Sequence, residues 1–271
     1  MSMTTIAGLL VGLVLFFSAI LMSTKNYIMF LSIQSFILVV GGTLANAFIS
    51  YQGRYVIQAL GDIKRMWGHA RMNETILYEE SRQVIEWADI VQAKGAIALE
   101  RHIKTNDSSD PFLRHGIQLV VDGYKGEEVR ELLTNMMRSE YQRNTRKVTV
   151  LKNMASAAPA FGMIGTLVGL IIMLESLSSD PNGIGRGLAV ALLTTLYGVL
   201  IAKFLFQPAA DKTLQREDNS RFRNFLMMEG FVMLAEQRPP RYIRERINSF
   251  LDPAVLADMN QLGTRPTPTE N

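Results

Sequence analysis

Residues 155–177 read ASAAPAFGMIGTLVGLIIMLESL, residues 178–187 read SSDPNGIGRG, and residues 188–206 read LAVALLTTLYGVLIAKFLF. The first and last stretches each hold about 20 mostly apolar residues. A helix of that length, rising about 1.5 Å per residue, crosses a hydrocarbon core roughly 30 Å thick. The middle stretch is rich in Gly, Ser, Asn and Asp, which favour turns. The sequence therefore predicts two membrane-spanning helices joined by a tight turn.

Both predicted helices carry small and hydroxyl-bearing residues where a lipid-facing helix would carry Leu or Phe. These residues are Pro159, Gly162, Gly165, Thr166 and Gly169 in the first helix, and Thr194, Thr195 and Gly198 in the second. Gly165 and Gly169 form a GxxxG pair, which lets two helix backbones approach closely. Pro159 removes a backbone donor and favours a bend. The pattern has two interpretations, simple packing of membrane helices or a polar-lined pathway.

The pathway interpretation rests on the hydroxyls. Threonine oxygens from two adjacent helices can replace water around a hard cation. Between residues 157 and 201 the ionisable side chains are Glu175, Asp180 and Arg186, which fall at the outer end of a helix or in the turn. If a cation crosses here, the mid-membrane carboxylate that carries it must come from another polypeptide.

A second apolar hairpin, residues 5–22 and 28–49, begins the chain. Of the 28 Lys and Arg residues, only Lys25 and Arg186 lie in the two short turns. Because cytoplasmic loops carry the excess positive charge, we expect four spans with both termini in the cytoplasm. The predicted organisation is a transmembrane hairpin at 1–50 with its turn at 23–27, a helical cytoplasmic loop at 51–153, a second hairpin at 154–207 with its turn at 178–187, and cytoplasmic helices with a disordered tail at 208–271.

The segments outside the membrane follow helical periodicity, so the predicted fold class is an all-α polytopic membrane protein with a helical cytoplasmic domain. Asp110 is placed to cap a helix that starts at Pro111. The helices are predicted at 54–69, 74–93, 95–104, 112–121, from Glu127 up to the third span, from the fourth span to about residue 237, and at 241–251.

Composition argues against several classes of protein. With 48% hydrophobic and 20% charged residues, the chain fits a membrane protein that has a sizeable water-exposed part. It has no cysteine, so a disulfide framework and a thiolate metal site are both excluded. The three histidines, His69, His102 and His115, lack metal-ligand spacing. Without a nucleophile elbow, a P-loop or a basic stripe with aromatics, we expect neither an enzyme nor a nucleic-acid-binding protein, and no bound cofactor.

Two motifs carry a resemblance to a known family. Residues 158–170, APAFGMIGTLVGL, and residues 189–198, AVALLTTLYG, closely resemble the A-subunit of bacterial flagellar stators, the MotA/PomA family. The likeness covers essentially the whole chain. It includes the two-hairpin layout, the inner loop of roughly a hundred residues, and Pro208 followed by Ala210, Asp211 and Lys212.

The resemblance implies an ion-driven torque generator. In that family, five A-subunits surround a dimer of MotB/PomB-like B-subunits, each of which supplies a membrane helix with an essential aspartate. Ion flux past the aspartate is held to rotate the ring of A-subunits, and the cytoplasmic loop pushes on the rotor protein FliG. The resemblance therefore implies that the B-subunit supplies the missing carboxylate. It also implies that the protein lies in the bacterial inner membrane, in contact with membrane lipids.

The family's functional positions map onto this chain residue by residue. Pro159 and Pro208 match two family prolines, and Thr166 and Thr195 match threonines that line the ion path, with Thr194 packed beside Thr195. Glu100 matches the acidic rotor-contacting residue, and Arg241 matches a family arginine. The sequence departs from the pattern where Gln92 and Ala93 replace basic residues, so the nearest cation is Lys94.

The transported ion is expected to be Na⁺, with H⁺ as the alternative. Proton-driven family members often carry Ala at the position of Thr166, and an added hydroxyl supplies a ligand that Na⁺ needs and a hopping proton does not. Two other functions stay open. One is a motor like ExbB or TolQ that energises the outer membrane, although those proteins usually have three spans. The other is a helical membrane scaffold without ion flux.

Overall fold

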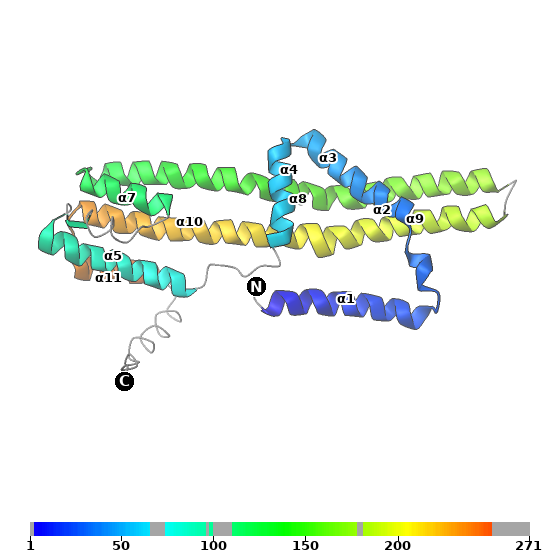
Figure 1. The fold of residues 1–271 in the computed structure, drawn as a ribbon, viewed down its shortest axis with the longest axis horizontal. Coiled ribbons are helices and arrows are strands. Elements are labelled where there is room, and N and C mark those ends of the chain that lie inside the picture. Colours follow the sequence, from blue (N-terminus) through cyan, green and yellow to red (C-terminus); the bar gives the residue numbers. More distant parts are fainter. Residues whose placement is uncertain (1–2, 66–73, 96–97, 100–109, 178–180, 251–271) are drawn as a thin grey trace. The chain divides into compact units, whose positions relative to one another are not determined.

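The computed structural model describes residues 3–65, 74–95, 98–99, 110–177 and 181–250. These residues are mostly helical, and no strand occurs among them, which confirms the all-α prediction (Figure 1). They belong to two compact units. The first unit comprises Met1–Ala70 with Asn144–Gln215, and the second comprises Arg71–Arg143 with Arg216–Asn271.

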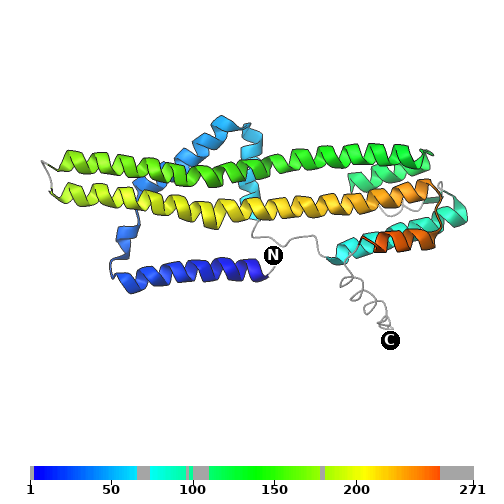
Figure 2. The ribbon, with the colours of Figure 1, turned by 180° about the vertical axis from the view of Figure 1, so that it is seen from behind.

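The first unit contains the apolar helices. They are α1 (Met3–Ser23), η1 (Tyr27–Phe30), α2 (Ile33–Phe36), η2 (Ile37–Gly41), α3 (Gly42–Ser50), α4 (Gly53–Arg65), the later part of α8 (Gly126–Ser176), α9 (Pro181–Ile201), η3 (Ala202–Phe206) and the start of α10 (Gln207–Ala235). Helices α8 and α9 lie side by side in both views (Figures 1 and 2).

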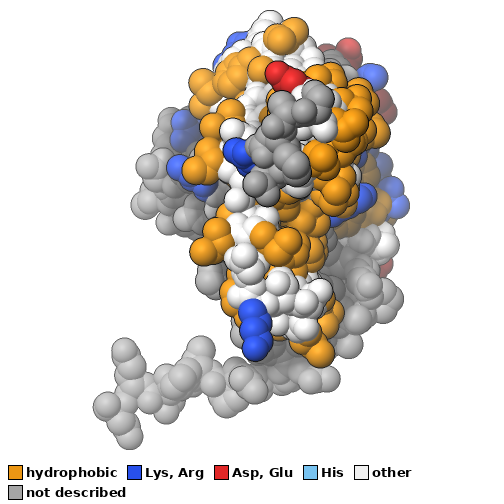
Figure 3. All heavy atoms as spheres, turned by 90° about the vertical axis from the view of Figure 1, so that its right-hand side faces the viewer, with side chains coloured by type: hydrophobic (Ala, Val, Ile, Leu, Met, Phe, Trp, Pro, Cys, Tyr) orange, Lys and Arg blue, Asp and Glu red, His pale blue; other side chains and the backbone are white. Residues whose placement is uncertain are grey.

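Three described helical stretches are long and apolar enough to cross a membrane, namely Tyr27–Ser50 and parts of Gly126–Ser176 and Ile184–Ala235. In α1 the stretch Leu10–Ser23 is a shorter apolar helix, so the fourth span stays a prediction. Hydrophobic side chains dominate the face that is seen end-on from the α8–α9 turn (Figure 3). Large apolar residues such as Leu15, Ile33 and Leu167 are more than half exposed in the single chain, as expected of a surface that meets lipid or another subunit.

The helix expected over residues 28–49 is not continuous. A short 3₁₀ helix, η1, is followed by extended backbone at Leu31 and Ser32, and α2 begins only at Ile33. Ser32 caps this restart, because its hydroxyl accepts from the backbone N–H of Ser35 at 3.2 Å. The next turn, η2, is π-helical, and so is η3 between α9 and α10. Both bulges interrupt otherwise regular apolar helices, a placement often associated with functional sites.

The second unit holds the charged helices. They are α5 (Glu74–Lys94), α7 (Pro111–Val121), the first part of α8, most of α10, and α11 (Pro240–Asn248). The predicted cap is confirmed, since the Asp110 carboxylate accepts from the Phe112 N–H at 2.8 Å. The core packs around Phe231, whose ring stacks on Trp87 at 6.0 Å between centroids. Gly116 admits the Phe231 ring, because a Cβ there would collide with it.

Helix boundaries agree with the sequence predictions within a few residues for α5, α7 and α10, and α11 ends at Asn248 rather than near residue 251. The helix predicted at 54–69 corresponds to α4, which is described up to Arg65. Most residues of the helix predicted at 95–104 lie outside the described residues, and so does the whole of the predicted disordered tail.

Candidate ion pathway and charged helices

The interface between α8 and α9 is built from backbone contacts at glycines. A Cβ placed on Gly169 would lie 2.6 Å from both the Ala191 nitrogen and the Gly187 carbonyl oxygen. At Gly162 it would lie 3.0 Å from the Thr194 carbonyl oxygen. These neighbours are backbone atoms that cannot rotate away, so the two helices approach as closely as they do only because the side chains are missing.

Two further glycines belong to the same interface. Gly165 faces Thr194, and a Cβ there would lie 2.5 Å from the Thr194 Cβ. Gly198 faces Ala158 and Pro159, with 2.6 Å from such a Cβ to the Ala158 carbonyl oxygen. The structure therefore brings the four predicted glycines to the contact between the two helices.

Pro159 lies inside α8, which continues through it. Because proline lacks an N–H, the carbonyl one turn earlier, on Ala155, has no partner in the helical hydrogen-bond ladder. Pro208 lies in the first turn of α10, directly after the π-helical turn η3. A π turn widens the helix, and this relieves the clash that a proline ring makes with the preceding turn. Both prolines thus lie in helical segments that continue past them.

The three threonine hydroxyls differ in what they contact. Thr194 is fully buried, and its Oγ1 donates within α9, at 3.0 Å to the Val190 carbonyl and 2.9 Å to the Ala191 carbonyl. Thr166 is half-buried, and its Oγ1 donates to the Met163 carbonyl at 2.6 Å. The oxygens of both hydroxyls keep lone pairs, but their protons are committed to the helix backbone.

Thr195 is different. Its Oγ1 is shielded from solvent and has no hydrogen-bond partner among the described residues. A buried hydroxyl without a partner costs roughly 1–3 kcal/mol, so such groups call for a partner that the single chain does not supply. Among the predicted pathway threonines, Thr195 is therefore the one whose hydroxyl makes no hydrogen bond to the described residues.

The α8–α9 region supplies no negative charge to such a ligand. Glu175 lies near the end of α8, Arg186 lies near the start of α9, and Asp180 lies outside the described residues. In the part of the chain that the structure describes, no group of three or more His, Asp or Glu side chains could hold a metal ion. The oxygens here can coordinate a cation but cannot neutralise it.

Sequence reasoning missed Tyr197, which lies one helix turn from Thr194. Its hydroxyl donates to the Phe30 carbonyl and accepts from the Ser32 N–H at 3.0 Å. It thereby satisfies two backbone groups that the break at Leu31 and Ser32 leaves without helical partners. The one local signal was a polar ring in an apolar helix, but its partners lie 165 and 167 residues away along the chain.

The predicted rotor-contacting residues belong to the second unit. Lys94 is exposed at the last residue of α5, and Arg241 is exposed in the first turn of α11, 3.4 Å from Glu245. Helix α11 packs on α5, so the two cations lie on neighbouring helices. Glu100 lies outside the described residues. Exposed pairs such as Arg241 and Glu245 contribute about 0–1 kcal/mol to stability, which leaves their charge free for a partner.

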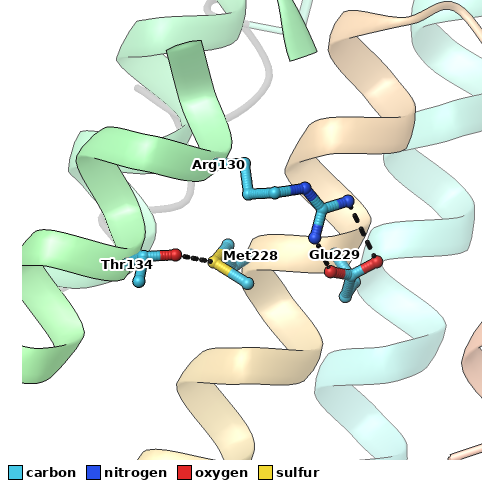
Figure 4. A network of polar contacts seen from close by, with 4 residues as sticks. All are labelled: Arg130, Thr134, Met228 and Glu229. Carbon is cyan, nitrogen blue, oxygen red and sulfur yellow. Dashed lines mark hydrogen bonds and ion pairs between the residues drawn. The ribbon is translucent and has the colours of Figure 1, made fainter. Parts of the chain in front are cut away.

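Other charged residues of this unit stabilise the packing of its own helices. The Arg130 guanidinium holds the buried Glu229 carboxylate in a two-pronged ion pair, and the Thr134 hydroxyl contacts the Met228 sulfur at 3.2 Å (Figure 4). The hydrogen bond to Glu229 raises the pKa of Arg130 above its usual value. These contacts fix α8 against α10.

Tyr141 and Glu140 extend this set of contacts between the same two helices. The Tyr141 hydroxyl donates to Asp218 at 2.7 Å, and that hydrogen bond raises the pKa of Tyr141. Burial, then the nearby charge of Asp110, raises the pKa of Glu140. Glu140 also accepts from the Asn224 side chain at 3.4 Å.

Residues 104–223 match the model of the MotA/TolQ/ExbB proton channel family. The chemotaxis protein PomA of Vibrio alginolyticus is 33% identical over 253 residues, which cover 93% of this chain and 96% of that protein.

Two solved structures share the fold. The structure of C. jejuni MotAB matches with a TM-score of 0.83 at 24% identity, covering 93% of this chain and 97% of the matched one. The flagellar MotAB stator complex from Bacillus subtilis matches with a TM-score of 0.81 at 21% identity, covering 98% and 99%.

Proposed function

This chain belongs to the MotA/PomA motility proteins of the MotA/TolQ/ExbB proton channel family, and from that premise we propose that it is the A-subunit of an ion-driven flagellar stator. In this proposal the chain lies in the bacterial inner membrane with both termini in the cytoplasm. It forms an ion pathway together with a B-subunit, and ion flux through that pathway rotates a ring of A-subunits.

The observation that carries the proposal is the buried, unpartnered hydroxyl of Thr195 in an interface without acids. An ion arriving there would gain an oxygen ligand in place of water, and the ion would still need a counter-charge. A carboxylate on a membrane helix of the B-subunit would supply both that charge and the other half of the site. The MotAB structures that share this fold support such a partner.

The remaining roles follow from the same proposal. Five copies of the chain would surround two B-subunits. Thr166 would face the ion from α8, Thr194 would pack behind Thr195, and Pro159 would allow α8 to bend as the site fills and empties. Lys94, Glu100 and Arg241 would transmit torque to the rotor protein FliG. Similarity to PomA over nearly the whole chain favours this role over that of an ExbB-like or TolQ-like motor.

We propose Na⁺ as the transported ion, because Thr166 adds a second hydroxyl to the pathway. Replacing it tests the assignment. Thr166→Ala removes one oxygen ligand while leaving the helix intact, since that hydroxyl bonds only within its own turn. Losing a ligand to a charged group weakens binding by about tenfold, so half-maximal swimming speed should require about ten times more external Na⁺.

The matched control is Thr149→Ala. Thr149 lies on the same helix, is exposed, and also donates to its own backbone, at 3.4 Å to the Thr145 carbonyl. It should leave the sodium dependence unchanged. Swimming that does not depend on Na⁺ in the parent would rule out sodium and leave the proton as the driving ion. A Thr166→Ala strain with the parent's sodium dependence would show that the Thr166 hydroxyl is not an ion ligand, and the argument for sodium from this residue would fail.

A further inference from the structure

Two arginines of the first unit converge on one tyrosine where α3 gives way to α4. The Arg54 guanidinium lies 4.7 Å from the centre of the Tyr55 ring, and the Arg146 guanidinium lies 5.4 Å from the same point. Both also donate to the Tyr55 hydroxyl, at 3.1 Å from Arg54 and 2.9 Å from Arg146. Two like charges are thus held against one neutral side chain.

Neither cation has a carboxylate partner among the described residues. A guanidinium has five N–H donors. Arg146 uses one on Tyr55, while Arg54 uses one on Tyr55 and another on Gln52 at 3.0 Å. Most of the donors on these two exposed side chains therefore face solvent. The cluster has both the charge and the donors to hold an anion.

The surrounding charges do not neutralise this cluster. Helix α4 and residues 144–153 of α8 each carry three basic residues, and the acid in these two segments is Asp62. That carboxylate is buried and is already paired with Lys147 at 3.0 Å. The ion pair fixes α4 on α8, and it holds the backbone beside Arg146 without using Arg146 itself. The excess positive charge is thus built into a fixed corner of the fold.

The apolar neighbours indicate what kind of anion fits. Phe48 and Ile49, at the end of the apolar helix α3, are 49% and 85% exposed, and Ile57 of α4 is 66% exposed. The Phe48 ring lies next to Gly53, since a Cβ on Gly53 would be 3.8 Å from it. An apolar surface therefore leads directly to the two guanidiniums. A lipid has this arrangement of acyl chain and anionic headgroup, whereas a free phosphate has no use for the apolar part.

We infer that Arg54, Tyr55 and Arg146 form a binding site for the headgroup phosphate of an anionic phospholipid, whose acyl chains lie on Phe48 and Ile49. The site fastens the α3–α4 corner to the cytoplasmic leaflet. The inference requires a membrane protein of this fold but does not depend on which ion is transported.

The test compares lipids on the full-length protein purified in detergent with its B-subunit. Binding of phosphatidylglycerol is measured by native mass spectrometry and by the shift in melting temperature, with phosphatidylcholine and inorganic phosphate as separate arms. Each arginine lost from the site removes a hydrogen bond to a charged phosphate and weakens binding by about tenfold, so Arg54→Gln with Arg146→Gln should weaken it by roughly 100-fold. Phosphatidylcholine and inorganic phosphate should stabilise the parent far less than phosphatidylglycerol.

The matched control is Lys64→Gln, which removes the same charge from an exposed position of the same helix. It should bind phosphatidylglycerol nearly as the parent does. Both arginines are exposed, so the double variant should melt at the parent's temperature when no lipid is added. Equal loss in Lys64→Gln would show diffuse charge attraction, and equal protection by inorganic phosphate would show a free-anion site. A double variant that falls apart would show that the arginines face a neighbouring subunit. Each of these three outcomes overturns the inference.

Discussion

The surroundings of Glu140 on α8 disfavour its ionised form. Burial is the main cause and Asp110 the next, while Arg143 and Arg223 oppose them and Glu217 adds to them. Its pKa in the folded protein therefore lies above its ordinary value of 4.5. A raised carboxyl pKa means that the folded state holds the proton more tightly than the unfolded state does, so stability falls as pH rises through this window.

Glu140→Gln should therefore stabilise the protein at neutral pH. The amide removes the charge but can still accept from Asn224, which the carboxylate contacts at 3.4 Å. We expect the variant to melt a little above the parent at pH 7. The difference should shrink as pH falls through the folded pKa and below 4.5, because the parent carboxyl then becomes protonated in both states. Melting temperature measured across this range checks the prediction.

The control for this experiment is Glu131→Gln, an exposed residue two turns earlier on the same helix. It should change the melting temperature little at any pH. A Glu140→Gln protein that is less stable than the parent at pH 7 would mean that the attraction to Arg143 and Arg223 outweighs the cost of burial.

Between elements, the polar bridge from Tyr197 to the break before α2 stabilises the packing of the apolar helices. Its hydroxyl satisfies the Phe30 carbonyl and the Ser32 N–H. Tyr197→Phe removes only that oxygen and leaves both backbone groups without this partner. An unsatisfied buried polar group costs about 1–3 kcal/mol, so the variant should lose stability on that scale in a denaturation experiment.

Tyr27→Phe is the matching control for Tyr197→Phe. Tyr27 is 47% exposed in η1, and no side-chain hydrogen bond of its hydroxyl is found within the described residues. Equal stability of the two variants would show that water reaches the break and replaces the tyrosine.

The sequence predicted those helix features that are decided by residues close together in the chain. The Asp110 cap and the apolar lengths of α8 and α9 were predictable, because the residues that decide them lie within one turn or one helix. The break at Leu31 and Ser32 was not, since its stabilising partner Tyr197 lies 165 residues beyond Ser32. The π turns were hidden for a similar reason, because nothing in the apolar runs of η2 and η3 marks where an extra residue enters a turn.

At the scale of the whole molecule, the candidate site also depends on contacts between residues that lie far apart in the chain. The glycines and threonines of the pathway follow from spacing, but only the three-dimensional contacts distinguish Thr195, whose oxygen is unpartnered, from Thr194, whose hydroxyl bonds its own helix. The convergence of Arg54 and Arg146 on Tyr55 was likewise invisible, because those two arginines lie far apart in the chain. Charge counts predicted the side of the membrane but not the position of each cation.

The number of spans is the property of the whole molecule that separates the stator from a three-span motor like ExbB or TolQ. It depends on α1, whose stretch Leu10–Ser23 is shorter than the other apolar helices.

The chain contains no cysteine, so a single introduced thiol reports one position. Four spans place Ser2 and Lys125 in the cytoplasm and Lys25 outside, as the distribution of Lys and Arg predicts. A membrane-impermeant maleimide should then label Lys25→Cys in intact cells, and label Ser2→Cys and Lys125→Cys only after lysis. If α1 does not cross, Ser2→Cys becomes labelled in intact cells while the other two keep their pattern, and the four-span layout is wrong.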